Sequence, residues 1–402
     1  MKPLYQKIIT VGVVGASFVL PQASFPKDSP SKNAPAPSQW SKQMQDMYKT
    51  LAELLTDVSS DQRFNDPKNF SKIKNNTKKL ATLTHELTPQ KADLPDPDPT
   101  IPIVAHMLSR ETERAVLELD RGHRAYARRI LRSVSNYCVT CHTRNASGPQ
   151  IDKLPFEPAH ESLSSIERGE FYVATRQFDR AQEEFRKVLE NPKPADLSSW
   201  DWEKAVRESL AIAVRVKKDP DQAKKIAQLV LGAEKAPLFM KDDAQAWLVS
   251  IEEWRKEPSK HAKTETGLYA EAVRLMTKAH EVQKYPVDRT ADVYYLRASS
   301  VIHQLLQTAP EGMYGAQALL MAGICYEVLN PIRTENIHDI YYETCIRKFP
   351  RTSQAELCYR RYEESIYLGY TGSAGTDIPS DVKKRLGELK ALSQVSASPP
   401  QK

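Results

Sequence analysis

Apolar residues recur every three or four positions along the first part of the chain, which is the spacing of amphipathic helices. The pattern predicts helices over residues 40–58, 66–87, 103–119 and 123–142, and residues 89–102, dense in Pro and Asp, connect the second to the third. Helices of similar length with short connections bury their apolar stripes well as an antiparallel bundle. We therefore expect residues 39–147 to form a four-helix bundle.

From about residue 160 the pattern changes to helices arranged in consecutive pairs. Gly169, Tyr172, Ala181, Phe185 and Val188 resemble the tetratricopeptide repeat in their spacing, with small residues where two helices cross and an aromatic residue filling the space between them. A looser copy of the same spacing follows about forty residues later. It consists of Ala211, Val214, Ala223, Ala227 and Val230.

Further helices are predicted at residues 294–306, 318–326, 338–345 and 354–368. The resemblance implies a tetratricopeptide-like α-solenoid over residues 160–370, in which each repeat buries its apolar face against its neighbours. Such arrays commonly dock a protein partner, and the alternative is that the repeats only enlarge the molecule. Residues 371–402 are expected to hold a C-terminal helix and a frayed tail.

Composition supports an all-α fold class. The 402 residues include 27 Pro but only 14 Gly, and helix-forming residues are abundant. A net charge of +6 is spread over 57 basic and 51 acidic residues without a long run of one sign. This mixed surface argues against nucleic-acid binding.

The N-terminus has the order of a secretory signal. Lys2 and Lys7 precede the apolar residues 8–20, and small or turn-forming residues follow. We expect residues 1–23 to be a cleaved signal peptide, residues 24–38 to be a flexible linker and the protein to be periplasmic. Pro21 makes the cleavage site poorly defined, so an uncleaved signal is the alternative. An uncleaved signal would tether the chain to the membrane.

The most specific chemical motif is Cys138-Val139-Thr140-Cys141-His142. Two thiols three positions apart can each bond one vinyl group of a haem, and the adjacent His can ligate the iron. The motif therefore predicts one covalently attached haem c.

Three other interpretations of the Cys pair are weaker. A thioredoxin-like dithiol would follow a β-strand, whereas the residues before Cys138 are helical. A structural zinc site would need a second Cys/His pair at suitable spacing. The strongest alternative is a simple disulfide between Cys138 and Cys141.

A bundle with this motif on its last helix resembles the cytochrome c-prime and cytochrome c-556 group. The resemblance covers about a quarter of the chain, and within it only the haem motif is specific. It implies that Cys138 and Cys141 form the thioethers and that His142 is the proximal iron ligand. It also implies that a residue of the first helix faces the iron, where a Met gives a six-coordinate electron carrier and an apolar residue leaves the site open.

Met44 and Met47 lie one turn apart on that first helix, and either is a candidate distal ligand, with Met44 preferred. The alternative is that both are core packing residues. His85, His106 and His123 are rival ligands, although lone helical histidines are more often surface or satisfied core residues.

Three more thiols belong to Cys325, Cys345 and Cys358. In an oxidising compartment two of them could be bridged, and the sequence does not tell which; three buried free thiols are the equal alternative.

Together these features predict an exported monohaem cytochrome that transfers electrons and docks a redox partner or membrane-associated complex through its repeats. One alternative is a five-coordinate haem sensor for a small gas, and another is an assembly scaffold with a structural haem. A peroxidase is disfavoured because no distal His/Arg pair is evident near the motif. The oligomeric state stays open.

Overall fold

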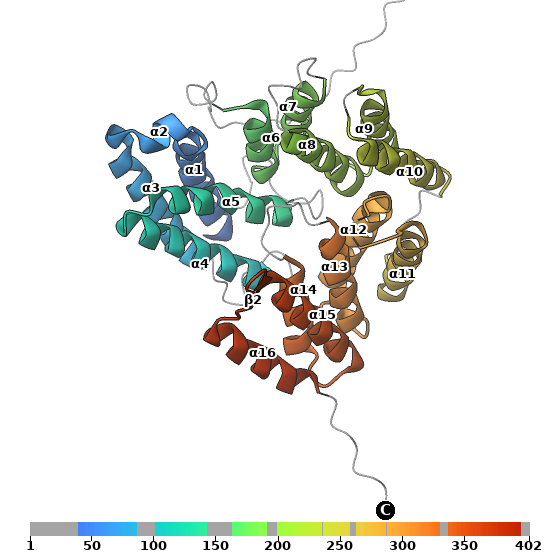
Figure 1. The fold of residues 1–402 in the computed structure, drawn as a ribbon. Helices are drawn as coiled ribbons and strands as arrows, with labels where there is room; N and C mark the ends of the chain where they lie inside the picture. Colours follow the sequence, from blue (N-terminus) through green and yellow to red (C-terminus); the bar gives the residue numbers. More distant parts are fainter. Residues whose placement is uncertain are drawn as a thin grey trace, which may run out of the picture. The chain divides into compact units, whose positions relative to one another are not determined.

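The computed structural model describes residues 39–86, 101–142, 163–190, 199–234, 236–257, 263–286, 288–329 and 337–394. Within these ranges the regular secondary structure is helical apart from one short hairpin, so the predicted all-α class is confirmed (Figure 1). The hairpin pairs β1 (Thr371–Gly372) antiparallel with β2 (Gly375–Thr376). The predicted signal peptide, the linker and the last eight residues lie outside the described ranges.

Five helices make up the first group. The second of them is a short helix that the sequence pattern did not predict. Its N-cap is Ser60, whose side chain accepts a hydrogen bond from the Arg63 backbone N–H. The fourth begins two residues earlier than predicted, because Pro102 fits the first turn of a helix. The group consists of α1 (Gln39–Ser59), α2 (Asp61–Asn65), α3 (Pro67–Glu86), α4 (Ile101–Asp120) and α5 (Arg124–His142).

The long helices of this group pack against their neighbours in sequence, and α5 also packs on α1. Side-chain contacts fix their directions. Asn76 of α3 donates to Glu53 of α1 at 3.2 Å, and farther along α1 Asp57 pairs with Lys72 of α3 at 2.9 Å, so α1 and α3 are antiparallel.

Helices α3 and α4 are antiparallel as well, since the Thr84 and Thr112 hydroxyls lie 2.7 Å apart and Lys74 pairs with Asp120 at 2.7 Å. A tight turn then reverses the chain into α5, with Gly122 at a φ of +81°. The four long helices therefore alternate in direction.

The remaining helices follow in series. Those of the middle part are α6 (Ser165–Ala174), α7 (Phe178–Leu189), α8 (Ser199–Ala211), the π-helical turn η3 (Ile212–Val216), α9 (Pro220–Gly232) and α10 (Leu238–Arg255). Those of the last part are α11 (Glu265–Val282), α12 (Asp292–Thr308), α13 (Gly315–Leu329), α14 (Ile337–Lys348), α15 (Ser353–Gly369) and α16 (Ser380–Ser393). Helices α12 to α15 contain the segments predicted from the pattern, whereas α10 and α11 were not predicted.

Helices adjacent in sequence pack as pairs, and several also contact the next helix but one, as α6 does α8 and α13 does α15. Two pairs approach very closely at a glycine. A Cβ on Gly169 of α6 would overlap the ring of Phe185 of α7, and a Cβ on Gly323 of α13 would overlap the ring of Tyr342 of α14. These glycines are required because the aromatic ring occupies the space of a side chain.

The largest buried core in the first half of the chain extends from the first helix group into α6 and α7. It includes Leu54 of α1, Leu131 of α5, Phe171 of α6 and Phe185 of α7. Contacts divide the chain only into residues 1–38 and 39–402, so the predicted boundary between a bundle and a repeat domain stays a prediction. Among the described residues, no helix has both the length and the apolar character needed to cross a membrane.

The close approach at Gly169 gives a testable prediction. Gly169→Ala should destabilise the fold by about 1–3 kcal/mol, because the new methyl group collides with the Phe185 ring. Gly387→Ala is the matched control, since it lies exposed inside α16 with no atom near the new Cβ, and should add about 0.5–1 kcal/mol of stability. Urea unfolding followed by circular dichroism measures both. Equal changes in the free energy of unfolding at the two positions would contradict the close packing of Gly169 against Phe185.

Candidate functional site

The predicted haem-attachment motif lies in the last turns of α5, whose backbone stays helical to His142. The side chains of Cys138, Cys141 and His142 are outside the described set. The helix before them is well packed: Leu131 and Val134 are each 1% exposed, and Tyr137 is also buried.

Helical geometry relates the motif positions to this buried face. At about 100° per residue, positions 138 and 142 fall within about 20° of Leu131 around the helix, and position 141 falls within about 20° of Val134. Both reference side chains belong to the core shared with α1. Helical periodicity therefore puts the three motif positions on the same side of the α5 backbone as these two buried residues.

The candidate distal ligands lie in the second and third turns of α1. Met47 is buried, and Met44 is half-buried and packs against the same core. Each stands seven residues before a buried leucine, Leu51 for Met44 and Leu54 for Met47, so both lie on the buried face of α1. A packing role alone would also place them there.

The starts and ends of these helices decide whether the two parts of the site lie at the same end. Arg128, in the second turn of α5, donates to the backbone carbonyls of Val58 and Ser59 at 2.7 and 2.8 Å, so α5 begins where α1 ends. The two helices run in opposite directions. Met44 and the motif positions 138–142 are therefore at the same end of the helix group.

The next helix along the chain also contacts α1 near these methionines. Tyr48, one turn after Met44, is buried with its ring centroid 5.8 Å from that of Phe171 of α6. Its hydroxyl hydrogen-bonds the Gln177 side chain, and burial raises the pKa of Tyr48 above its ordinary value. The turn between α6 and α7 thus holds the part of α1 that carries Met44.

The three histidines considered as rival ligands are all exposed. His85 lies 3.1 Å from Glu113, and His123 lies 2.7 Å from Glu118. His106 is exposed on α4 rather than directed into the core. Their positions agree with the surface role that single helical histidines usually have.

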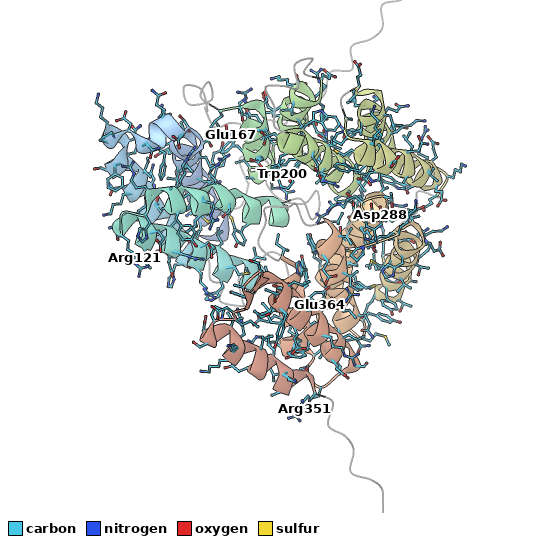
Figure 2. All side chains as sticks on the ribbon, in the orientation of Figure 1. Arg121, Glu167, Trp200, Asp288, Arg351 and Glu364 are labelled. Atoms are coloured by element: carbon cyan, nitrogen blue, oxygen red, sulfur yellow. The ribbon has the colours of Figure 1, made fainter. Side chains whose placement is uncertain are left out.

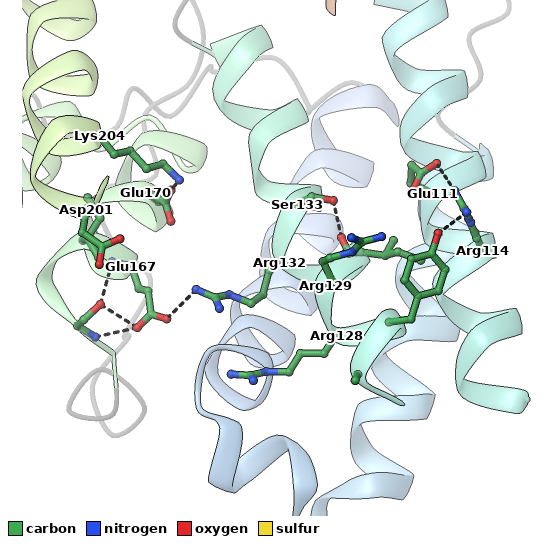
Figure 3. Close-up of a pocket in the computed structure, with 15 residues that line it drawn as sticks. Glu111, Arg114, Arg128, Arg129, Arg132, Ser133, Glu167, Glu170, Asp201 and Lys204 are labelled. Atoms are coloured by element: carbon green, nitrogen blue, oxygen red, sulfur yellow. Dashed lines mark hydrogen bonds and ion pairs between the residues drawn. The ribbon is translucent and has the colours of Figure 1, made fainter. Parts of the chain in front are cut away.

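A pocket of about 640 Å³ with many charged lining residues lies beside α5, and the sequence pattern did not predict it. Arg132 of α5 faces Glu167 of α6 across it at 3.6 Å, as Figure 3 shows. Arginines dominate the wall formed by α4 and α5, whereas the opposite wall is mostly acidic. The charged lining residues are Arg114, Arg128, Arg129 and Arg132 with Glu111 on one side, and Glu167, Glu170, Asp201 and Lys204 on the other.

The charges of this pocket largely serve the protein itself. Glu170 pairs with Lys204, and Glu167 forms a capping box with Ser164 at the start of α6. The guanidinium groups of Arg114 and Arg129 lie about 5 Å from the Tyr126 ring centroid. Since both signs of charge are present in near-equal number, the pocket does not select a ligand of one charge.

A second ionisable cluster joins α8, α10 and α12. Arg207 and Arg289 both bind Asp292, at 3.1 and 3.0 Å, and Asp288, labelled in Figure 2, lies in the preceding loop. Burial, together with the neighbouring Asp292 carboxylate, raises the pKa of Asp243 to about 7. The folded chain therefore holds a proton at this carboxyl up to about neutral pH.

Among the side chains that the structure describes, no three His, Cys, Asp or Glu gather as a metal site would require. Comparison of the chain with models of protein families, with curated proteins and with solved structures gives no match.

The contact between α1 and α6 can be tested by substitution. Phe171→Ala should cost about 3–5 kcal/mol of stability through the cavity it leaves, whereas Tyr48→Phe should cost only about 1 kcal/mol because it keeps the ring and removes the hydroxyl that bonds Gln177. Tyr285→Phe, on an exposed tyrosine, is the control and should change stability little. Chemical unfolding measures all three. A loss for Phe171→Ala no larger than that for Tyr285→Phe would disprove the contact.

Proposed function

We propose that this protein is an exported c-type cytochrome that carries one haem and transfers electrons. Cys138 and Cys141 hold the haem through thioether bonds, and His142 is the proximal iron ligand. When bound, the haem supplies an iron centre that accepts and donates one electron. The chain's own contribution is to attach the group, to exclude water from it and to choose the second axial ligand.

One observation carries the proposal: positions 138, 141 and 142 continue the buried line of α5 marked by Leu131 and Val134. A covalent haem needs its attachment and ligand positions directed into an apolar interior, where burial tunes the iron potential. A surface disulfide would have no such requirement. The residues around the motif therefore fit the group.

The distal side of the iron is assigned to Met44, with Met47 as the alternative. Both residues lie on the buried face of α1, at the end of the helix group where α5 finishes. A thioether is a soft donor that binds haem iron and raises its potential. Methionine ligation gives a six-coordinate electron carrier. If neither Met binds, the iron has an open position and the protein is a gas-binding sensor.

The finer fold belongs to the same proposal. The alternating helices α1, α3, α4 and α5 form a four-helix bundle of the cytochrome c-prime type, and α6 onward form tetratricopeptide-like repeats. Packing between consecutive helices and the contact of Gly169 with Phe185 support the repeat assignment. The repeats dock a redox partner or a membrane-associated complex in the periplasm.

Absorption spectra of the ferric and ferrous protein test this function. We expect low-spin iron with a Met-to-iron charge-transfer band, and reversible one-electron reduction in voltammetry. Met44→Ala should abolish the band and open the iron to carbon monoxide. Met107→Ala is the matched control, because Met107 is a half-buried methionine on α4 that packs against the same core; it should leave the band in place.

The alternatives give different results. If Met47→Ala abolishes the band and Met44→Ala does not, the distal ligand is Met47, about one turn farther along α1. High-spin iron that takes up carbon monoxide in the unsubstituted protein would contradict the electron carrier and favour the sensor.

A further inference from the structure

The three thiols in the last part of the chain have different surroundings. Cys325 of α13, Cys345 of α14 and Cys358 of α15 are all fully buried, and each is a free thiol in the structure. The Cys325 sulfur lies 3.4 Å from the thioether of Met276. Its neighbour is therefore a methionine, not a second thiol.

Cys345, in contrast, lies close to Cys358. The Cys345 thiol donates to the backbone carbonyl of Gln354 at 3.7 Å, and its nearness helps to raise the pKa of the Cys358 thiol. Gln354 stands four residues before Cys358, so its carbonyl faces the backbone N–H of Cys358 within α15. The Cys345 sulfur thus lies against the turn of α15 that carries Cys358.

The fold keeps this pair together. Helices α14 and α15 are joined by only four residues, 349–352, and pack along their lengths in one core that includes both cysteines. Thirteen positions separate the two residues in sequence. Disulfides form between cysteines whose backbones are already close, and they persist in oxidising compartments.

We propose that Cys345 and Cys358 form a disulfide in the exported protein and that Cys325 stays a free thiol. The proposal rests on the export part of the proposed function, but not on the haem. It resolves which two of the three thiols pair, a choice that the sequence leaves open.

A disulfide donor of the thiol–disulfide oxidoreductase class supplies the oxidation. The Cys345 thiolate attacks the donor disulfide and releases one donor thiol, forming a mixed disulfide. The Cys358 thiolate then attacks the Cys345 sulfur, closes the bridge and releases the second donor thiol. Two thiol protons are lost from the protein, and the donor disulfide is reduced to two thiols.

The timing follows from burial. Burial raises the pKa of the Cys358 thiol far above its ordinary value, and Cys345 contributes in the same direction. Because the thiolate is the nucleophile, the folded pair reacts very slowly. The bridge therefore forms as α14 and α15 come together, while the donor still reaches the sulfurs, and burial afterwards shields it from reductants.

Peptide mapping of the full-length protein from the periplasm of a host with c-type maturation tests the proposal. The protein is denatured without reductant in the presence of an alkylating reagent and then digested. We expect a cross-linked peptide pair containing Cys345 and Cys358, two hydrogens lighter than its parts, and an alkylated Cys325. Alkylation of Cys345 and Cys358, or a bridge to Cys325, would overturn the proposal.

The unsubstituted protein alone shows whether Cys345 and Cys358 are bridged. Two variants serve as controls for the assignment of the cross-linked peptides. Cys358→Ala should leave Cys345 alkylated, whereas the control Cys325→Ala should keep the cross-link. The absorption spectrum of the same sample separates this proposal from the proposed function. Haem with alkylated Cys345 and Cys358 refutes only the disulfide, and a cross-link without haem refutes only the cytochrome.

Discussion

Helical periodicity along α5 is the constraint on which the proposed site depends. Its backbone stays helical from Arg124 to His142, so the side chains that anchor the core and the positions of the haem motif lie on one line. A break before Cys138 would release the motif from that line. The antiparallel partner α1 then brings its first turns, with Met44, to the same end of the helix group.

Burial of α1 links this end of the helix group to helices α6 and α7. The Tyr48 ring packs on Phe171, and both belong to the core that continues from α1 into α7. Loss of this contact would expose apolar surface on both sides and loosen the helix that carries the candidate distal ligand. Helices α6 and α7 therefore have a structural part at the end of the helix group where the Cys138–His142 motif lies.

Much of the helical pattern could be predicted from the sequence, because the spacing of apolar residues is a local signal. That signal placed α1, α3, α5 and α12 correctly. It missed α10, whose exposed face carries Leu238, Phe239 and Val249, since exposed apolar residues blur the period. The pocket beside α5 and the pairing of Cys345 with Cys358 depend on contacts between separate helices, which no local spacing reveals.

One part of the candidate site could likewise be predicted from local sequence, and the other part depends on contacts between helices. The Cys138–His142 motif is a local pattern with a known chemical meaning, whereas the choice of distal ligand for the proposed haem depends on how α1 packs against α5. Mass spectrometry of the peptide Ser133–Arg144, from protein produced in a host with a c-type assembly system, tests the central claim most directly. The account predicts that this peptide carries one haem bound through Cys138 and Cys141. Recovery of both cysteines as free thiols or as a disulfide, without haem, would contradict it.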